Sequence, residues 1–131
     1  MTDQRPADQR LEVSPATVYA EGLVAGLLRY QRCENCGRAV FYPRVACPHC
    51  GTARLQWADS AGLGTVYSTT VTRSRSGDYN VALIDLDEGY RMMCTVRDDL
   101  EREVRIDDRV EAVVPPGTTA ETLSFRRTEQ P

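Results

Sequence analysis

The stretch CENCGRAVFYPRVACPHCG, residues 33–51, decides the fold, because it holds two C-x-x-C pairs separated by ten residues. Each pair, Cys33–Cys36 and Cys47–Cys50, places two thiolates on one tight loop, where both can reach a metal ion at about 2.3 Å. Gly37 and Gly51 follow the pairs and allow the backbone to turn sharply beneath the metal. Two such loops facing each other complete a tetrahedron, and zinc is the usual ion for four thiolates.

The spacing therefore predicts one structural zinc ion per chain, and the predicted ligands are Cys33, Cys36, Cys47 and Cys50. Four protein ligands leave no open position at which the ion could activate water. The metal would instead supply folding free energy, on the order of 10 kcal/mol for small sites of this kind. Iron held by the same thiolates is one alternative. Two separate redox pairs or disulfides are another, but they would leave a small lobe with almost no core.

Other side chains that could carry chemistry do not suggest a catalytic site. His49 is the only histidine and lies inside the second pair, which argues against a Ser–His or Cys–His apparatus. We expect it to point outward, although it could replace a cysteine ligand. Cys94 lies on an apolar strand face and is expected to be a buried core thiol. We expect the acidic residues of segment 98–108 to form a solvated surface: Asp98, Asp99, Glu101, Glu103, Asp107 and Asp108.

The residues before the cysteines predict a flexible tail and a short helix. Residues 1–13 are polar, which is typical of a frayed terminus. Ser14 followed by Pro15 is typical of a helix start, with Ser as the N-cap. A helical segment is therefore predicted over 14–30, where apolar residues recur at helical spacing: Val18, Tyr19, Leu23, Leu27 and Leu28.

The metal-binding lobe is predicted to span 31–58, and the pattern then changes to strands. Five short strands are expected, near 64–72, 81–86, 91–96, 110–114 and 122–126. One helical turn over 98–101 is expected between the third and the fourth strand. This order fits a five-stranded Greek-key barrel of the OB type over 59–131, with an SH3-like barrel as the main alternative. The predicted fold class is therefore mainly β.

Composition and charge bound the function. The chain of 131 residues is 41% hydrophobic and 27% charged, which is typical of a globular protein of one domain or two very small ones. It has no apolar run near the ~20 residues that span a bilayer, so no membrane association is expected. The N-terminus lacks the apolar segment of a secretory signal, so a cytoplasmic location is expected. Residues 29–75 carry seven arginines and two acids, whereas 76–131 carry seven arginines and thirteen acids.

The cysteine region and its flanks resemble a known family. The matching pieces are YAEGL from Tyr19, QRCENCGR from Gln31, FYPRVACPHCG from Phe41, GLGTVYS from Gly62 and VALIDLDEG from Val81. In this order they are similar to the acyl-CoA-associated OB-fold proteins with a rubredoxin-like zinc ribbon (domain-of-unknown-function family 35). Tyr19 departs mildly from the family, which often has Phe or Trp at this place.

The resemblance implies a short N-terminal helix, a rubredoxin-like zinc ribbon and a C-terminal OB-fold. It also implies a non-catalytic accessory subunit of a thiolase-superfamily enzyme, or of an acyl-CoA hydratase or aldolase, that bridges enzymes or helps to hold the acyl-CoA. Such a subunit would work in a hetero-oligomer. The identity of the acyl chain is not implied.

Two further expectations concern ligands. Arg73 and Arg75 follow the first predicted barrel strand, where their guanidinium groups could bind the phosphates of coenzyme A. Ordinary surface charge is an equally good interpretation of these two arginines.

Nucleic-acid binding is the alternative function, since zinc ribbons and OB-folds both serve it. A pI near 5.2 and the scarcity of aromatic residues on the expected second and third strands disfavour that alternative.

Overall fold

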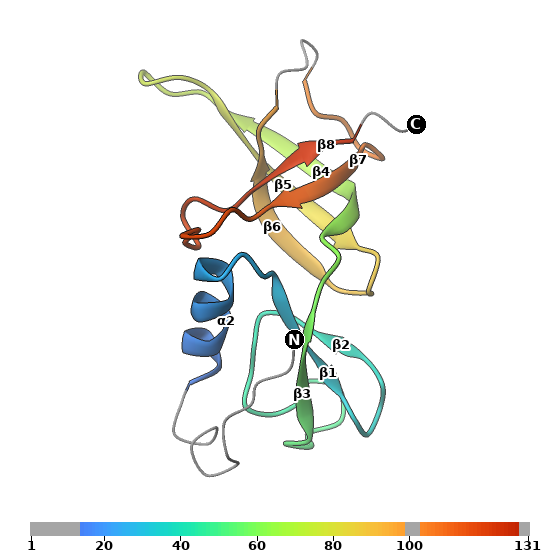
Figure 1. The fold of residues 1–131 in the computed structure, drawn as a ribbon. Helices are drawn as coiled ribbons and strands as arrows, with labels where there is room; N and C mark the ends of the chain where they lie inside the picture. The colour runs from blue at the N-terminus through green and yellow to red at the C-terminus, as the bar shows by residue number, and fades with distance from the viewer. Residues whose placement is uncertain (1–13, 99–102, 129–131) are drawn as a thin grey trace.

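The computed structural model describes residues 14–98 and 103–128. These residues form a mainly β fold with one short helix, a three-stranded sheet and a closed five-stranded barrel. The sequence predicts the mainly β class, the short helix and the five-stranded barrel. In Figure 1 the helix and the small sheet lie at one end of the molecule and the barrel lies at the other. No helix within the two described ranges is long and apolar enough to cross a membrane. The tail predicted over 1–13 and most of the helical turn predicted at 98–101 lie outside them.

Helix α2 (Pro15–Val24) begins where the sequence predicts but ends earlier. The side chain of Ser14 caps its first turn by accepting a hydrogen bond from the backbone N–H of Thr17. At the other end Gly26 adopts a φ of 86°, and the backbone N–H of Leu27 donates to the carbonyl of Gly22 at 2.7 Å. This glycine-centred ending is the Schellman motif, and it turns the chain out of the helix. The expectation that Leu27 and Leu28 lie on the helix was therefore wrong.

The small sheet carries the cysteine loops. Its strands are β1 (Arg29–Cys33), β2 (Ala39–Val40) and β3 (Leu55–Asp59), and β1 lies in the middle with an antiparallel partner on each side. The first cysteine loop connects β1 to β2, and the second lies in the segment between β2 and β3. One small sheet therefore fixes both loops.

The barrel strands run close to the predicted segments. They are β4 (Leu63–Thr72), β5 (Tyr79–Leu86), β6 (Arg91–Val96), β7 (Arg109–Val113) and β8 (Ser124–Arg127). Their order around the barrel is β4-β5-β6-β8-β7, and every neighbouring pair is antiparallel except β6 with β8. On β6 the side chains of Met92 and Val96 are buried and that of Cys94 is half-buried, so the predicted inward face is confirmed.

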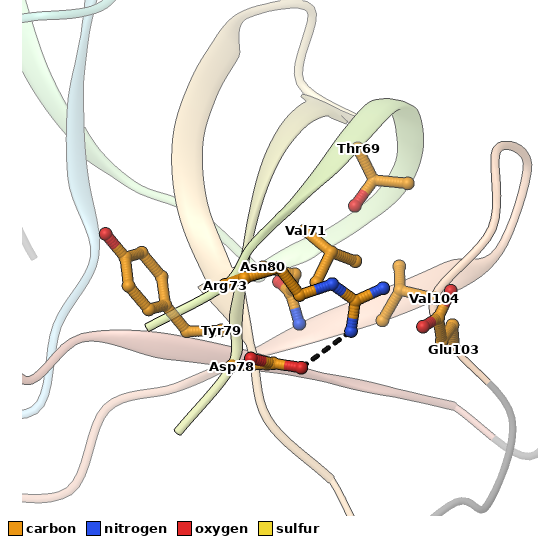
Figure 2. A pocket seen from close by; sticks show the side chains of 8 residues that line it. All are labelled: Thr69, Val71, Arg73, Asp78, Tyr79, Asn80, Glu103 and Val104. Carbon is orange, nitrogen blue, oxygen red and sulfur yellow. Dashed lines mark hydrogen bonds and ion pairs between the residues drawn. The ribbon is translucent and has the colours of Figure 1, made fainter. Parts of the chain in front are cut away.

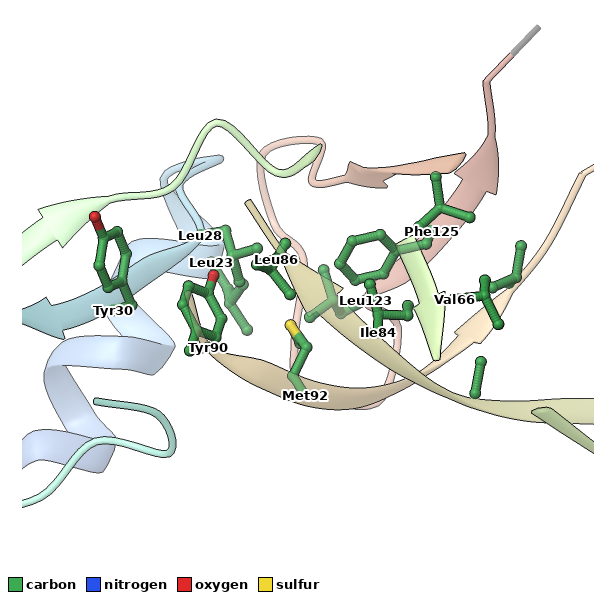
Figure 3. Close-up of a cluster of buried hydrophobic side chains, with 13 residues drawn as sticks. Leu23, Leu28, Tyr30, Val66, Ile84, Leu86, Tyr90, Met92, Leu123 and Phe125 are labelled. Carbon is green, nitrogen blue, oxygen red and sulfur yellow. The ribbon is translucent and has the colours of Figure 1, made fainter. Parts of the chain in front are cut away.

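One hydrophobic core joins the two ends of the molecule. Figure 3 shows Leu23 of α2, Leu28 just before β1 and Tyr30 of β1, which belong to one cluster with barrel residues such as Ile84 and Phe125. This core is therefore continuous across the junction, and a second, smaller cluster lies beside the cysteine loops.

The junction itself is aromatic and polar. The ring of Tyr90, at the start of the barrel's third strand, stacks on Tyr30 at 5.0 Å and on Phe41 at 4.9 Å between centroids. The carboxylate of Glu88 accepts hydrogen bonds from the Ser60 hydroxyl and the Ala61 backbone N–H, both at 2.8 Å. These contacts fix the orientation of the small sheet on the barrel.

The acidic segment after β6 corrects one expectation. Asp98 does not belong to a solvated surface, because its side chain is 11% exposed and accepts hydrogen bonds from Arg127 at 2.6 and 2.7 Å. Arg127 is 4% exposed, since it follows Phe125 on the inward face of β8. Asp108, at 4.0 Å from Arg127, is also largely buried. Asp98 and Asp108 are therefore buried because both lie close to the buried guanidinium of Arg127.

Candidate metal centre

Four thiols converge between the two cysteine loops. The sulfur atoms of Cys33, Cys36, Cys47 and Cys50 all lie within 4.8 Å of one another. The Sγ–Sγ distance is 3.6 Å for Cys33 and Cys50, and 3.7 Å for Cys36 and Cys47. A tetrahedral zinc ion with bonds of about 2.3 Å requires sulfur atoms about 3.8 Å apart. The spacing of the four sulfurs therefore fits one structural zinc ion, as the sequence predicts.

The two loops repeat the same backbone geometry. Gly37, with a φ of 76°, donates its N–H to the carbonyl of Cys33 at 2.9 Å. Gly51, with a φ of 82°, donates to the carbonyl of Cys47 at 2.8 Å. A side chain is strained at such positive φ values, so glycine is required at both places. The structure thus confirms the role expected of the residue after each pair.

Backbone N–H groups point at the sulfur atoms from the same loops. The N–H of Cys36 donates to the sulfur of Cys33, and the N–H of His49 donates to the sulfur of Cys47, each at 3.4 Å. The side-chain amide of Asn35 reaches the sulfur of Cys50 at 3.6 Å. Donors of this kind stabilise the negative charge that four thiolates leave on a divalent ion.

The metal-free thiols differ strongly in acidity. The backbone N–H of Thr52 and then the amide of Asn35 lower the pKa of Cys50 to about 6. The backbone N–H of Arg38 acts to lower the pKa of Cys36, but desolvation and the hydrogen bonds with its three neighbouring thiols together raise that pKa to about 11. Crowded thiols cannot all ionise together, so binding of a cation would release protons from the cluster.

The burial of the centre is uneven. Cys33 and Cys47 are buried and form a small second core with Val40, whereas Cys36 and Cys50 are exposed. The side chain of His49 is exposed, and its Nδ1 lies 3.3 Å from the guanidinium of Arg38. The ring therefore points away from the sulfur cluster, which is the outward orientation expected from the sequence.

Gln31 is a supporting residue that the sequence analysis did not identify. It is buried in β1, and its amide makes two hydrogen bonds with the main chain of Arg44: Nε2 donates at 2.8 Å and Oε1 accepts at 2.7 Å. The segment that carries the chain from β2 to the second cysteine loop is held in place by this clamp. The sequence around Gln31 gives no signal of this role, because its partner thirteen residues away is set by the fold.

The two arginines expected to bind coenzyme A lie at the opposite end of the barrel. Arg73 lies at the end of the β4–β5 hairpin beside a cavity of about 180 Å³. Figure 2 shows its guanidinium beside the carboxylate of Asp78, with which it forms an ion pair at 2.6 Å. The hydrogen bond from Arg73 holds the pKa of Asp78 below its usual value. Arg75 is exposed in the adjoining loop and does not line the cavity.

Cys94 is not part of the metal centre. Its thiol is half-buried against the barrel core and lies 3.3 Å from the carbonyl oxygen of Leu123. Burial raises the pKa of this thiol, so little thiolate is available near neutral pH. The structure agrees with a core thiol, although one less buried than expected.

Comparison with known proteins identifies both parts of the chain. The family model described as the ChsH2 rubredoxin-like zinc ribbon domain matches residues 20–56. The family model described as the ChsH2 C-terminal OB-fold domain matches residues 57–114. The two matches adjoin and together cover most of the chain. They confirm the rubredoxin-like ribbon and the OB type of the barrel.

Similar individual proteins carry several names. A DUF35 domain-containing scaffold protein of Methanocaldococcus jannaschii is 33% identical over 89 residues, which are 63% of this chain and 63% of that protein. A probable enoyl-CoA hydratase alpha subunit of Thermomonospora curvata is 37% identical over 68 residues, which are 48% of this chain and 21% of that protein. The chain thus aligns with less than two thirds of either relative's length.

Solved structures agree over nearly the whole length. A chain from the structure described as "Ltp2-ChsH2(DUF35) aldolase" is 29% identical, with a TM-score of 0.70 over 94% of this chain and 98% of that one. A DUF35 protein of unknown function from Sulfolobus solfataricus, 17% identical, shares the fold with a TM-score of 0.68 over 93% of this chain and 92% of that one. The chain therefore belongs to the DUF35 family, in which a ChsH2-type rubredoxin-like zinc ribbon precedes an OB-fold.

Proposed function

We propose that the chain is a non-catalytic scaffold subunit of an acyl-CoA enzyme complex. The favoured partner is a thiolase-superfamily enzyme, with an acyl-CoA hydratase or aldolase as the alternative partner. The subunit would hold the partner in place and help to retain or channel the acyl-CoA.

The observation that carries this proposal is the closed set of four cysteine ligands. The four sulfurs fill the coordination sphere of a zinc ion, so the ion has no position for water or substrate. A metal held in this way stabilises the ribbon, and the shared core connects the ribbon to the barrel. The architecture thus supports a fixed, two-lobed shape, which suits a scaffold.

The names of the similar proteins support an enzyme partner. Three archaeal relatives are called scaffold proteins, and the 29% identical structure is described as an aldolase together with ChsH2. The hydratase subunit of Thermomonospora curvata adds acyl-CoA chemistry to this set. None of these names fixes the partner of this chain, and the thiolase remains our inference.

Charge pairing on the barrel disfavours the nucleic-acid alternative. Arg91, Arg109 and Arg126 pair with the carboxylates of Asp85, Asp87 and Glu111, respectively. A nucleic-acid phosphate backbone is bound by Lys or Arg side chains that are not already paired with carboxylates of the protein. These three arginines are already neutralised within the chain, which supports an acyl-CoA enzyme as the partner class. We also infer a cytoplasmic site of action, because four cysteines that serve as thiolate ligands of zinc suit a reducing compartment.

Co-purification from the native host tests the proposal. The tagged full chain is loaded with zinc, and proteins retained with it are identified by mass spectrometry. We expect an acyl-CoA enzyme, present in a fixed ratio through size-exclusion chromatography. Recovery of nucleic acid or of no acyl-CoA enzyme, or turnover of a thioester by the isolated chain, would reject the proposal.

A further inference from the structure

A line of exposed apolar side chains crosses from the ribbon to the barrel. Tyr42, in the segment after β2, is 54% exposed, and Met93 on β6 is 57% exposed. The two residues touch, because the backbone N–H of Met93 donates to the hydroxyl oxygen of Tyr42 at 3.4 Å. Large apolar side chains that lie together on a surface often mark a place where another protein binds.

The line continues across the outer face of the barrel. Met93 pairs with Leu83 of β5 in the antiparallel register, so their side chains lie side by side on the outer face. Two residues before Met93, Arg91 lies on the same face, and its guanidinium stacks over the ring of Tyr67 on β4 at 3.6 Å from the centroid. Tyr67 is 52% exposed. We call Tyr42, Tyr67, Leu83, Arg91 and Met93 the junction strip.

The junction strip is rigid. At the ribbon end, Tyr42 follows Phe41, whose ring is stacked on Tyr90 within the junction. Gln31 clamps Arg44 on the other side of Tyr42, as described above. At the barrel end the strip lies on three hydrogen-bonded strands. A surface that is ordered before binding loses little conformational entropy when a partner covers it.

The one charge of the strip is neutralised by a neighbouring carboxylate. Arg91 is its one cation, and the carboxylate of Asp85 holds it with contacts of 2.5 and 3.1 Å. Its guanidinium also lies flat on an aromatic ring, where burial by an apolar partner is tolerated. An anionic ligand would find no available cation on the strip, whereas an uncharged apolar protein face would match it.

We propose that the junction strip is the docking surface for the acyl-CoA enzyme, which covers it with an uncharged apolar face. This inference rests on the proposed function and adds the site of contact to it. Because the strip takes side chains from both lobes, the enzyme would bind only when the ribbon is folded and fixed on the barrel. Zinc would then control docking from a distance, through the position of Tyr42.

The test uses the acyl-CoA enzyme that co-purifies with the full chain and measures its affinity by biolayer interferometry. Met93→Glu changes the barrel side of the strip, and Tyr42→Ala changes the ribbon side. Val24→Glu is the matched control, because Val24 is 56% exposed on α2 and lies outside the strip. Zinc content and thermal unfolding are checked for every variant, so that a folding defect is recognised.

We expect Met93→Glu to weaken binding about 30-fold or more and Tyr42→Ala about tenfold, which is the range of central interface residues. Val24→Glu should bind like the wild type. If the enzyme binds the Met93→Glu variant and the wild type with equal affinity, the junction strip is not the docking surface, but the proposed scaffold function is unaffected. An effect confined to one lobe, or an equal effect of the control, also rejects the junction strip as the docking surface.

Two other results are distinguishable. If the wild-type chain retains no acyl-CoA enzyme at all, the proposed function fails and the inference fails with it. If Met93→Glu converts a dimer of the chain into a monomer in sedimentation velocity and leaves enzyme binding unchanged, the strip is an interface between copies, and the inference is overturned.

Discussion

Gly64 lies where β4 approaches β5 too closely for any side chain. A Cβ atom added there would lie 2.7 Å from the carbonyl oxygen of Asp85 and 2.8 Å from the side chain of Ile84. We expect Gly64→Ala to destabilise the protein by about 1–3 kcal/mol, since the strand must shift to relieve these contacts. Urea unfolding measures the change. Thr70→Ala, at an exposed position of the same strand, is the control and should stay within about 0.5 kcal/mol of the wild type.

The buried pair of Asp98 and Arg127 is the second test at this scale. Removing the carboxylate with Asp98→Ala leaves a guanidinium that is 4% exposed without its main partner. The expected loss is about 3–5 kcal/mol. Glu111→Ala breaks the exposed pair with Arg126 instead and should cost no more than about 1 kcal/mol. Equal midpoints of denaturation for the two variants would contradict this assignment.

The pair of Asp98 and Arg127 also shows which residue roles cannot be predicted from the sequence alone. Spacing identified the four cysteines and the glycines after them, because their chemistry is local. Asp98 looked like one of several solvated acids, and only the fold brings it to an arginine 29 residues away. The alternation of Leu123 and Phe125 was visible in the sequence, but it did not reveal that Arg127 continues this buried face or which group would neutralise its charge.

At the scale of elements, the end of α2 was not predictable from the apolar spacing. The helical segment predicted over 14–30 runs past Gly26, whereas this glycine follows the C-cap, ends the helix and places Leu28 in the core. Strand β1 was not predicted as a strand, since its buried residues do not alternate: Tyr30, Gln31 and Cys33 are all buried. The barrel strands were predictable because one face of each meets the core and the other meets solvent.

The ribbon is the element whose folding depends on metal. Chelation of zinc, or Cys33→Ser, should unfold the ribbon and also lower the melting temperature of the barrel, because Tyr30 and Leu28 belong to the barrel's own core. Near-ultraviolet circular dichroism of the Tyr30–Tyr90 stack and calorimetry measure the two effects. Cys94→Ser, outside the metal centre, should keep one equivalent of zinc. A barrel that melts at the same temperature with and without zinc would refute the coupling.

At the scale of the whole molecule, the proposed contact with coenzyme A can be tested in the assembled complex. Arg73 can bind a phosphate only by exchanging its partner Asp78 for the ligand. We expect Arg73→Glu combined with Arg75→Glu to weaken coenzyme A binding about tenfold or more in titration calorimetry. Arg126→Glu, on another part of the barrel, should have no effect. Equal affinities of the double variant and the wild type would exclude the two arginines as ligands.

The order of helix, ribbon and barrel was predictable because each carries its own local signal. Their arrangement was not, since it depends on contacts between distant residues. Glu88 is the clearest example: it lies between two predicted strands, yet its carboxylate accepts hydrogen bonds from Ser60 and Ala61 in the linker between the lobes. The junction strip exists only because of that arrangement.

The barrel is closed by its shortest pairing. Strands β6 and β8 share only two rungs, Thr95 with Ser124 and Val96 with Phe125, in the parallel orientation. The barrel can open locally at this short pairing while its four antiparallel strand pairings persist. Amide protons of Thr95 and Phe125 would then exchange with deuterium sooner than those of Ala82 or Ile84 in the middle of β5. The barrel would open locally between β6 and β8.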